Sequence, residues 1–322
     1  MRKQFSVPEP LHPGPRWALG KAQRMFPKSR SGRTLYGIFA RRDVLKGVAP
    51  ILILSLVGAP AVGQIPSAKN SLLENVALCN GSDRASPENQ INGCTAVIAS
   101  VGSRAPAAAM AYNNRGDAYT AKGDYDRAVQ DFDQSIKLNP TNAKPFNNRG
   151  LAYLKKGEYD LAIKNLEQAI RLDPNYAKAF INRAETYEKK NAYDRAARDY
   201  DEAIRLEPNM KSAWKGRCWT RAVLGELQAA LEDCNKALQS EPADASTFDS
   251  RGLAYLKLGQ LDSALDDYNS ALGSDPKLAS ALYGRGLAKR KKGDISGGDA
   301  DISAAKKIHA KIAQDFARYG LQ

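Results

Sequence analysis

The chain has 322 residues, with 48 lysine or arginine residues against 35 aspartate or glutamate residues and a formal charge of +13 at pH 7. Eleven of the basic residues and two of the acidic ones lie in residues 1–64, so that segment carries +9 and the rest of the chain carries +4. Because the excess charge is concentrated in this leader, the composition argues against nucleic-acid binding by the remainder.

The first 64 residues are predicted to direct the chain out of the cytoplasm. Residues 1–38 are rich in Pro, Gly and Arg and have no apolar periodicity, which predicts a disordered basic leader. Residues 39–64 resemble a twin-arginine export signal, because Arg41 and Arg42 precede an uncharged run from Gly47 to Gly63. Such a signal is removed from the mature protein, and we therefore expect a periplasmic location.

Alternatives remain for this segment. An uncleaved signal would anchor the protein in the inner membrane, although the apolar run is short for a spanning helix, which needs about 20 residues. An Arg-rich and acid-poor leader is also compatible with an organellar transit peptide. Because the export signal lies far from Met1, a start of translation at Met25 is a further alternative.

A period of 34 residues runs through the rest of the chain. Prolines keep this spacing, and so do arginines that precede a small residue and large apolar or aromatic residues. The prolines are Pro106, Pro140, Pro174, Pro208, Pro242 and Pro276, and the arginines are Arg115, Arg149, Arg183, Arg217, Arg251 and Arg285. The large residues are Tyr112, Phe146, Phe180, Trp214, Phe248 and Leu282. A repeat of this length indicates one structural unit per period.

Each unit is predicted to be a pair of helices. In the second unit a first helix is expected over 143–156, because Phe146, Gly150 and Tyr153 share one face at helical spacing. A second helix is expected over 159–172 and ends before a proline, which cannot donate the next backbone bond. The residues expected to end the first helices in a left-handed conformation are Gly123, Gly157, Asn191, Gly225, Gly259 and Gly293. One pair cannot bury its own apolar face, so neighbouring pairs must stack.

This pattern resembles the tetratricopeptide repeat (TPR), in which W-x2-L-G-x2-Y, A-x3-F and P recur with the same period. The resemblance covers roughly residues 75–318, with five repeats over 109–278, although arginine stands where the family pattern has leucine before the small residue. It implies an all-α fold in which antiparallel helix pairs stack into a superhelical solenoid. It also implies a concave groove that binds a partner protein or an extended peptide, and no catalytic chemistry.

Both ends of the repeat array are expected to depart from the pattern. Residues 65–108 are interpreted as a degenerate N-terminal repeat, in which Pro106 keeps the period while the first half, around Leu78 to Ala85, has lost its anchors. Residues 279–322 are interpreted as a sixth, degenerate repeat. Since its closing proline is replaced by alanine, we expect its second helix to continue from about Ala300 to Arg318 as a capping helix.

The repeated arginines have a predicted structural role. Each lies 16 residues before an acidic or amide side chain of the second helix, and these side chains are Asp131, Asn165, Asp199, Asp233, Asp267 and Asp301. We expect an ion pair between the two helices of a unit. Exposed pairs of this kind contribute about 0–1 kcal/mol each.

The chain has four cysteines, Cys79, Cys94, Cys218 and Cys234. Cys218 and Cys234 stand where a small and a large residue of the two helices meet, so we expect them to be in contact, and Cys79 and Cys94 span a similar hairpin. Both pairs are candidate disulfides in an exported protein, whereas small buried thiols are the alternative in a cytosolic one. No C-x-x-C motif is present, which argues against a zinc site.

A second stripe on the first helix of each unit lines the concave groove that the TPR resemblance implies. It includes Asn114, Asn148 and Asn182, a row similar to the asparagine ladder of O-GlcNAc transferases. An asparagine amide carries both donors and an acceptor, so such a row can hold a peptide backbone. The other groove residues expected to contact a peptide are Lys144, Lys178, Leu151, Trp219 and Leu253. A solvated polar helix face is the alternative interpretation.

The sequence favours a protein-interaction scaffold over an enzyme. The two histidines, His12 and His309, belong to no nucleophile–histidine–carboxylate set, and no phosphate-binding loop or H-E-x-x-H motif is present. We therefore predict no catalytic residue, no metal site and no cofactor. The expected partner is a protein or peptide; self-association as a homo-oligomer through Trp219 or the C-terminal cap is the alternative. A thiol oxidoreductase is a remote alternative, because it would need a reactive cysteine pair.

Overall fold

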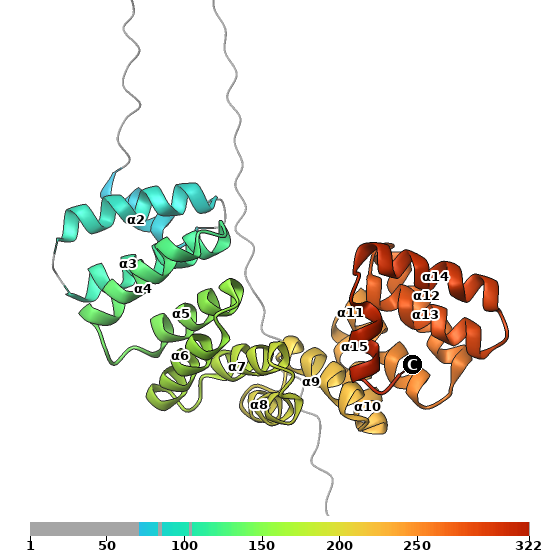
Figure 1. Ribbon diagram of the computed structural model, residues 1–322. Coiled ribbons are helices and arrows are strands. Elements are labelled where there is room, and N and C mark those ends of the chain that lie inside the picture. Colours follow the sequence, from blue (N-terminus) through green and yellow to red (C-terminus); the bar gives the residue numbers. More distant parts are fainter. Residues whose placement is uncertain (1–70, 83–85, 103–104, 322) are drawn as a thin grey trace, which may run out of the picture. The chain divides into compact units, whose positions relative to one another are not determined.

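The computed structural model describes residues 71–82, 86–102 and 105–321. These described residues form fifteen α-helices and no strand (Figure 1). The helices are α1 (Leu72–Cys79), α2 (Pro87–Val101), α3 (Ala105–Ala121), α4 (Tyr125–Leu138), α5 (Ala143–Lys156), α6 (Tyr159–Leu172), α7 (Ala177–Lys189), α8 (Tyr193–Leu206), α9 (Lys211–Leu224), α10 (Leu227–Ser240), α11 (Ala245–Lys257), α12 (Leu261–Ser274), α13 (Ala279–Lys291), α14 (Ile295–Ile308) and α15 (Ile312–Arg318). The predicted basic leader, 1–38, and the predicted export signal, 39–64, lie outside the described residues.

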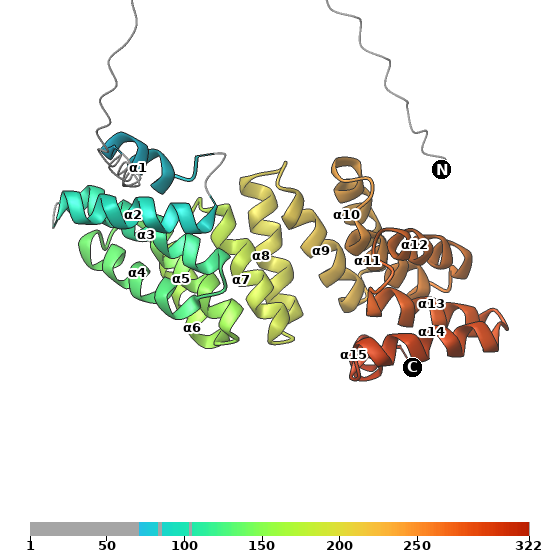
Figure 2. The ribbon, with the colours of Figure 1, turned by 90° about the horizontal axis from the view of Figure 1, so that it is seen from above.

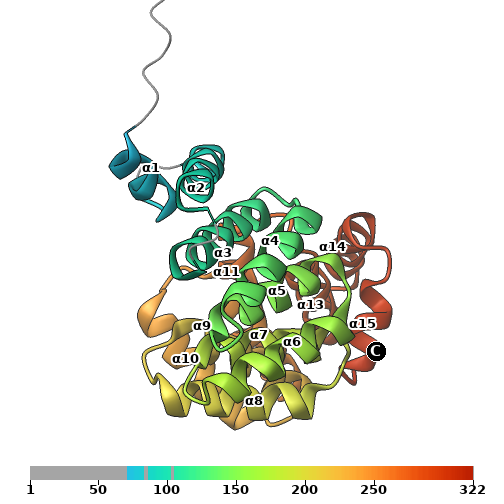
Figure 3. The same ribbon diagram turned by 90° about the vertical axis from the view of Figure 1, so that its left-hand side faces the viewer.

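From α3 to α14 the helices form pairs that follow one another in chain order (Figure 2). Each first helix packs on its partner in the pair, and each second helix packs on the first helix of the next pair. Neighbouring first helices are also in contact. Successive pairs turn about a common direction, as the view in Figure 3 shows, and the predicted all-α superhelical fold is confirmed.

The helix ends follow from local backbone chemistry. α5 and α6 have the bounds that the sequence predicted. All six residues expected to adopt a left-handed conformation do so, with φ between 58° at Asn191 and 95° at Gly293. At the end of α5 this conformation lets the N–H groups of Gly157 and Glu158 donate to carbonyl oxygens of the last turn, which would otherwise lack partners.

In four of the six pairs from α3 to α14, a large side chain of the second helix packs on a glycine of the first. Leu166 is fully buried, and a Cβ atom on Gly150 would lie 2.7 Å from its Cγ atom. Phe132, Tyr268 and Ile302 contact Gly116, Gly252 and Gly286 in the same way. Tyr268 also packs on Gly284 of the following pair. Glycine therefore sets the close approach of the helices within and between pairs.

The predicted contact between each repeated arginine and its partner on the second helix is present. In five units, Nε and Nη2 of the arginine donate to both oxygens of the aspartate over 2.7–2.8 Å. The aspartate side chains are only 3–11% exposed, so these pairs are largely buried. In the five units that have an aromatic residue three positions before the arginine, this residue also lies 4.8–5.6 Å from the guanidinium group.

Several of these arginines also bond to the preceding pair, a contact that the sequence did not predict. Nη1 of Arg217 donates to Asp201 over 2.6 Å, and Nη1 of Arg251 donates to Asn235 over 2.6 Å. One guanidinium group thus fixes both the two helices of its own pair and the position of the pair before it. Bidentate, partly buried pairs of this kind impose geometry as well as attraction.

The C-terminal end differs from the predicted continuous capping helix. α14 ends at Ile308, one period after α12 ends at Ser274, and a separate short helix α15 begins at Ile312. The break does not need proline, because the Ile312 N–H donates to the His309 carbonyl oxygen in the turn that also separates the earlier pairs. Ile308, the last residue of α14, is 50% exposed.

The N-terminal end also differs in detail. The first helix, α1, covers Leu72–Cys79, so it begins before the segment around Leu78 to Ala85 in which we expected it. α2 ends at Val101, and Pro106 lies in the first turn of α3 rather than closing α2. A proline is tolerated there because the first N–H groups of a helix have no intrahelical partner. The interpretation of 65–108 as a degenerate repeat remains a prediction.

Candidate functional site

The first helices of the pairs line a groove that contains two neighbouring cavities. The first, of about 620 Å³, lies against α3, α5, α7 and α9. The second, of about 840 Å³, extends from α5 to α13. Six predicted groove residues border the first cavity: Asn114, Asn148, Asn182, Lys144, Lys178 and Leu151. The other two lie further along, with Trp219 at the second cavity and Leu253 at a third one of about 310 Å³.

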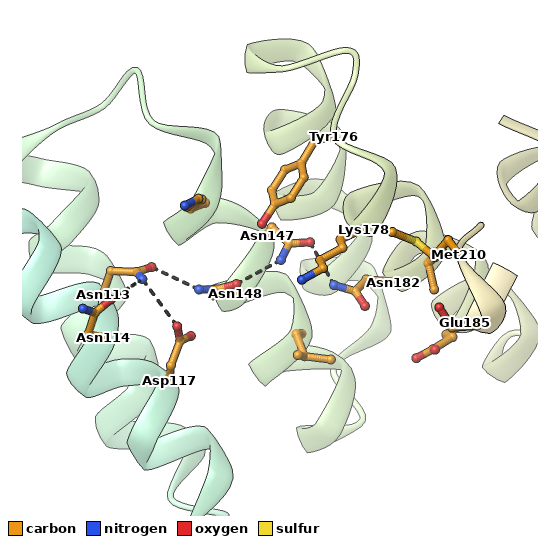
Figure 4. Close-up of a pocket in the computed structure, with 14 residues that line it drawn as sticks. Asn113, Asn114, Asp117, Asn147, Asn148, Tyr176, Lys178, Asn182, Glu185 and Met210 are labelled. Carbon is orange, nitrogen blue, oxygen red and sulfur yellow. Dashed lines mark hydrogen bonds between the residues drawn. The ribbon is translucent and has the colours of Figure 1, made fainter. Parts of the chain in front are cut away.

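The asparagine side chains of the first cavity are bonded to one another (Figure 4). Asn182 Nδ2 donates to Asn147 Oδ1 over 2.8 Å, and Asn147 Nδ2 donates to Asn148 Oδ1 over 2.9 Å. The chain continues from Asn148 Nδ2 to Asn113 Oδ1 over 3.1 Å and from Asn113 Nδ2 to Asn114 Oδ1 over 3.3 Å. These bonds connect three consecutive repeats through one row of amides.

Sequence reasoning missed two members of this row, Asn113 and Asn147. Both are buried, and each bridges a ladder residue of its own helix to one of the next helix. A signal was available, because the two lie one period apart and directly precede Asn114 and Asn148. The third repeat has Ile181 at this position, which also borders the cavity. The row therefore ends at Asn182.

The amide row keeps hydrogen-bonding capacity for a ligand. An asparagine amide offers two N–H groups and an oxygen with two lone pairs. Asn148 uses one N–H group toward Asn113 and one lone pair toward Asn147. Asn182 uses one N–H group, and its oxygen has no partner among the described residues. The hydrogen bonds within the row fix the orientation of each amide group. The donors and acceptors that remain unpaired are therefore held in fixed directions.

Two exposed lysines, Lys144 and Lys178, border the same cavity without an ion-pair partner among the described residues. Asp117 supplies a carboxylate on α3, where it accepts a hydrogen bond from Asn113 Nδ2 over 3.4 Å. The first cavity thus presents polar groups of both signs around a neutral amide row. Such a surface suits the alternating donors and acceptors of a peptide backbone.

The apolar end of the predicted groove is occupied in part by the chain itself. The ring of Trp219 meets that of Tyr193 at 5.5 Å and that of Tyr319 at 6.0 Å, both edge to face. Tyr319 follows α15, so the C-terminal segment packs on a residue three pairs earlier in the chain. Leu253, expected as an apolar contact for a peptide, is only 4% exposed and belongs to the core. Trp219 therefore remains at the cavity surface, whereas Leu253 is largely covered.

Glu188 lies at the second cavity without an ion-pair partner among the described residues. Its Oε1 atom accepts hydrogen bonds from Thr220 over 2.7 Å and from the Tyr200 hydroxyl over 3.1 Å. Burial raises the pKa of Glu188 to about 7, and the two hydroxyl groups oppose this rise. The charge of nearby Glu185 raises the pKa of Glu188 further, and the charge of Lys189 lowers it.

This shift makes the stability of the fold depend on pH. Because the folded chain holds the Glu188 proton more tightly than the unfolded chain, Glu188 favours folding below its ordinary pKa of 4.5, and that contribution is lost as the pH rises toward 7. We expect Glu188→Gln to remove about 1–2 kcal/mol of the decrease in unfolding free energy between pH 5 and pH 8, a figure reduced for solvent screening. Denaturant titration at both pH values measures it. The exposed control Glu232→Gln should keep the wild-type pH dependence, and the same dependence in Glu188→Gln would contradict the assignment.

The four cysteines lie together in the two predicted pairs. The Cα atoms of Cys79 and Cys94 are 4.4 Å apart, and those of Cys218 and Cys234 are 5.1 Å apart. Both separations fall within the range that a disulfide spans. All four side chains are buried, with at most 3% of their surface exposed. Reactive cysteines are partly exposed, so this environment is that of structural cysteines.

Protein-family models match segments of the chain that follow the 34-residue period. A model described as TPR repeat matches residues 116–157, 150–191 and 252–293, and one described as tetratricopeptide repeat matches residues 177–210. The matched segments, residues 116–210 and 252–293, are similar to tetratricopeptide repeats. The segment between the matched TPR repeats carries Cys218 and Cys234 at positions where the neighbouring repeats have a small residue and a large one. A search of curated proteins finds no match.

Solved TPR structures share the fold. A tetratricopeptide repeat protein from Parabacteroides merdae is 16% identical with a TM-score of 0.56, over 77% of this chain and 99% of that chain. The pilF protein of Pseudomonas aeruginosa is 16% identical with a TM-score of 0.55, over 65% and 97%. The Cut9–Hcn1 hetero-tetramer of the APC/C is also 16% identical, with a TM-score of 0.59 over 78% and 52%. At this identity the likeness concerns the TPR fold alone.

The side chains of the described part of the chain contain no group of three or more His, Cys, Asp or Glu residues arranged to hold a metal ion. Among its helices, none combines the length and the apolar character needed to cross a membrane. The predicted signal segment lies outside these residues, so the anchored alternative remains a prediction.

Proposed function

We propose that the TPR repeats form a scaffold that holds an extended segment of a partner protein in the concave groove. The observation that carries this proposal is the bonded row of five asparagines in the first cavity. A peptide backbone presents N–H and C=O groups at regular intervals, and a pre-oriented amide row can pair with both. Lys144 and Lys178 at the rim add cations that pair with carbonyl or carboxylate oxygens of the segment.

The proposal includes export and oxidised cysteines. The twin-arginine resemblance in residues 39–64 supports a periplasmic location, where disulfides form and persist. The close approach of Cys79 to Cys94 and of Cys218 to Cys234 is consistent with that environment. Export and disulfide formation support each other, because disulfides persist in the periplasm. Neither proposal depends on the groove.

Self-association is less well supported than partner binding. It was predicted to use Trp219 or the C-terminal cap, but Trp219 packs against Tyr193 and Tyr319 of the same chain. Phe316 of the cap is 2% exposed and packs on Tyr283 at 4.7 Å. The apolar surface that a second copy would cover is therefore already largely covered.

Replacing three asparagines of the amide row should weaken partner binding strongly. The full chain with Asn114, Asn148 and Asn182 replaced by alanine is compared with wild type for recovery of binding proteins from an extract of the producing cell, quantified by mass spectrometry. Each lost amide contact costs about 1 kcal/mol, so three reduce affinity about 100-fold.

A matched triple variant controls for general effects of substitution. Gln130, Lys164 and Arg198 are exposed, lie one period apart on the second helices and do not border the groove cavities. Their replacement by alanine should leave recovery unchanged. Equal recovery by the asparagine variant and this control would show that the amide row does not bind the partner.

A further inference from the structure

A tryptophan and a carboxylate meet at the boundary between the second and third cavities. Trp219 on α9 and Asp249 on α11 border both cavities. They lie beyond the asparagine row, which borders the first cavity only. The edge-to-face contacts of Trp219 with Tyr193 and Tyr319 fix the orientation of its ring.

Asp249 has no cation to balance its charge. Its Oδ2 atom accepts one hydrogen bond, from Ser280 Oγ over 2.6 Å, and it forms no ion pair among the described residues. Burial raises the pKa of Asp249 to about 7, and the Ser280 bond alone opposes this rise. A carboxylate removed from water without a cation is unfavourable unless a ligand supplies the missing charge.

The lysines at the second cavity serve other carboxylates. Lys215 pairs with Asp244 over 2.9 Å, and Lys156 pairs with residues of its own and the preceding repeat. Lys155 and Lys189 act on Glu185, whose pKa their charges lower against the effect of burial. The cavity therefore contains cations, but none of them compensates Asp249.

The combination of Trp219 and Asp249 occurs once in the array. At the position of Asp249 the other repeats have Asn113, Asn147, Ile181, Lys215 and Tyr283. At the position of Trp219 they have Asp117, Leu151, Glu185, Leu253 and Leu287. Neither residue is required by the repeat, since the remaining units fold with other side chains at both positions. The pair is therefore specific to this point of the groove.

We propose that Asp249 and Trp219 bind a cationic side chain, arginine or lysine, of the extended segment held in the groove. The cation would pair with the free Oδ1 atom of Asp249 and lie against the Trp219 ring, whose face attracts positive charge. Glu188, which also borders the second cavity without a cation of its own, extends the region of negative charge toward the asparagine row. This inference rests on the proposed function, in which the amide row holds the backbone of the same segment.

A pair of isosteric peptides tests the proposal. A short capped alanine peptide with one central arginine is titrated into the full chain by calorimetry, beside the same peptide with neutral citrulline in place of arginine. We expect the arginine peptide to bind about tenfold more tightly, as for a partly desolvated charge pair. Asp249→Asn keeps the shape of the side chain and should reduce this preference to about twofold or less.

Matched variants separate the possible outcomes. Asp266→Asn removes one charge from an exposed position of the same repeat and should keep the tenfold preference, whereas Trp219→Phe should weaken it. Equal binding of both peptides by the wild-type chain, or an unchanged preference in Asp249→Asn, would overturn this inference and leave the proposed function intact. Failure of both peptides to bind would contradict the proposed function as well.

Discussion

Replacing Gly284 by alanine is expected to destabilise the fold by about 3 kcal/mol, because the added methyl group has no space. A Cβ atom there would lie 2.3 Å from Cζ and 2.4 Å from the hydroxyl oxygen of Tyr268. The ring of Tyr268 is fully buried and also packs on Gly252, so it cannot move aside. Chemical denaturation of wild type and variant measures the difference in unfolding free energy.

The same substitution at Gly273 provides the control. Gly273 lies in α12, and a Cβ atom at this position would meet nothing within 4 Å. Gly273→Ala should therefore stabilise the fold by about 0.5–1 kcal/mol, the gain that alanine has over glycine in a helix. A double variant with Gly284→Ala and Tyr268→Leu should recover part of the loss. Similar effects of the two single glycine substitutions would show that the approach of α12 to α13 is not limiting.

Reduction of the Cys218–Cys234 pair is expected to lower the unfolding free energy by about 3 kcal/mol in the chain-entropy account of a loop of this size. The exported chain, denatured without reductant, should show no free thiol to a maleimide reagent. After reduction it should show four labelled cysteines, Cys79, Cys94, Cys218 and Cys234. Labelling counted by mass spectrometry gives the number, and denaturation with and without reductant gives the energy.

The variant with Cys218→Ala and Cys234→Ala separates the two pairs. Any remaining effect of reductant on its stability belongs to Cys79 and Cys94, which lie on α1 and α2. Four free thiols in the unreduced exported chain would contradict the proposed disulfides. That result would not contradict the α9–α10 helix pair, in which Cys218 and Cys234 occupy buried positions.

Most of the helix pairs could be predicted because one local signal repeats without interruption. The bounds of α5 and α6 followed from apolar spacing, a left-handed residue and a closing proline. Where the closing proline is absent, the end of the second helix was predicted wrongly. Ala310 replaces proline, yet α14 still ends on period, because the turn at His309 is held by a backbone bond that leaves no mark in the sequence.

The candidate site was predictable in position and less so in its contacts. Helical geometry placed Asn114, Asn148 and Asn182 at one cavity, as the structure shows. It did not give the bonds through Asn113 and Asn147, which depend on the separation of neighbouring helices. Predicting these contacts requires the packed structure, whereas predicting the row of asparagines requires only the 34-residue period.

The covering of Trp219 was beyond prediction from the sequence. Its partner Tyr319 lies 100 positions later in the chain, and superhelical curvature brings the two rings together. Local periodicity carries no information on that curvature, which accumulates over several pairs. Leu253, expected at the groove surface, is found in the core.

The packing of the last described residues has a practical consequence for the design of reporters. Tyr319 lies against Trp219, and Leu321 is only 9% exposed. A fluorescent protein or affinity handle attached next to Leu321 would compete with ligands for space at the apolar end of the groove. An internal attachment point on a second helix, such as the exposed Lys164, keeps a label away from that surface.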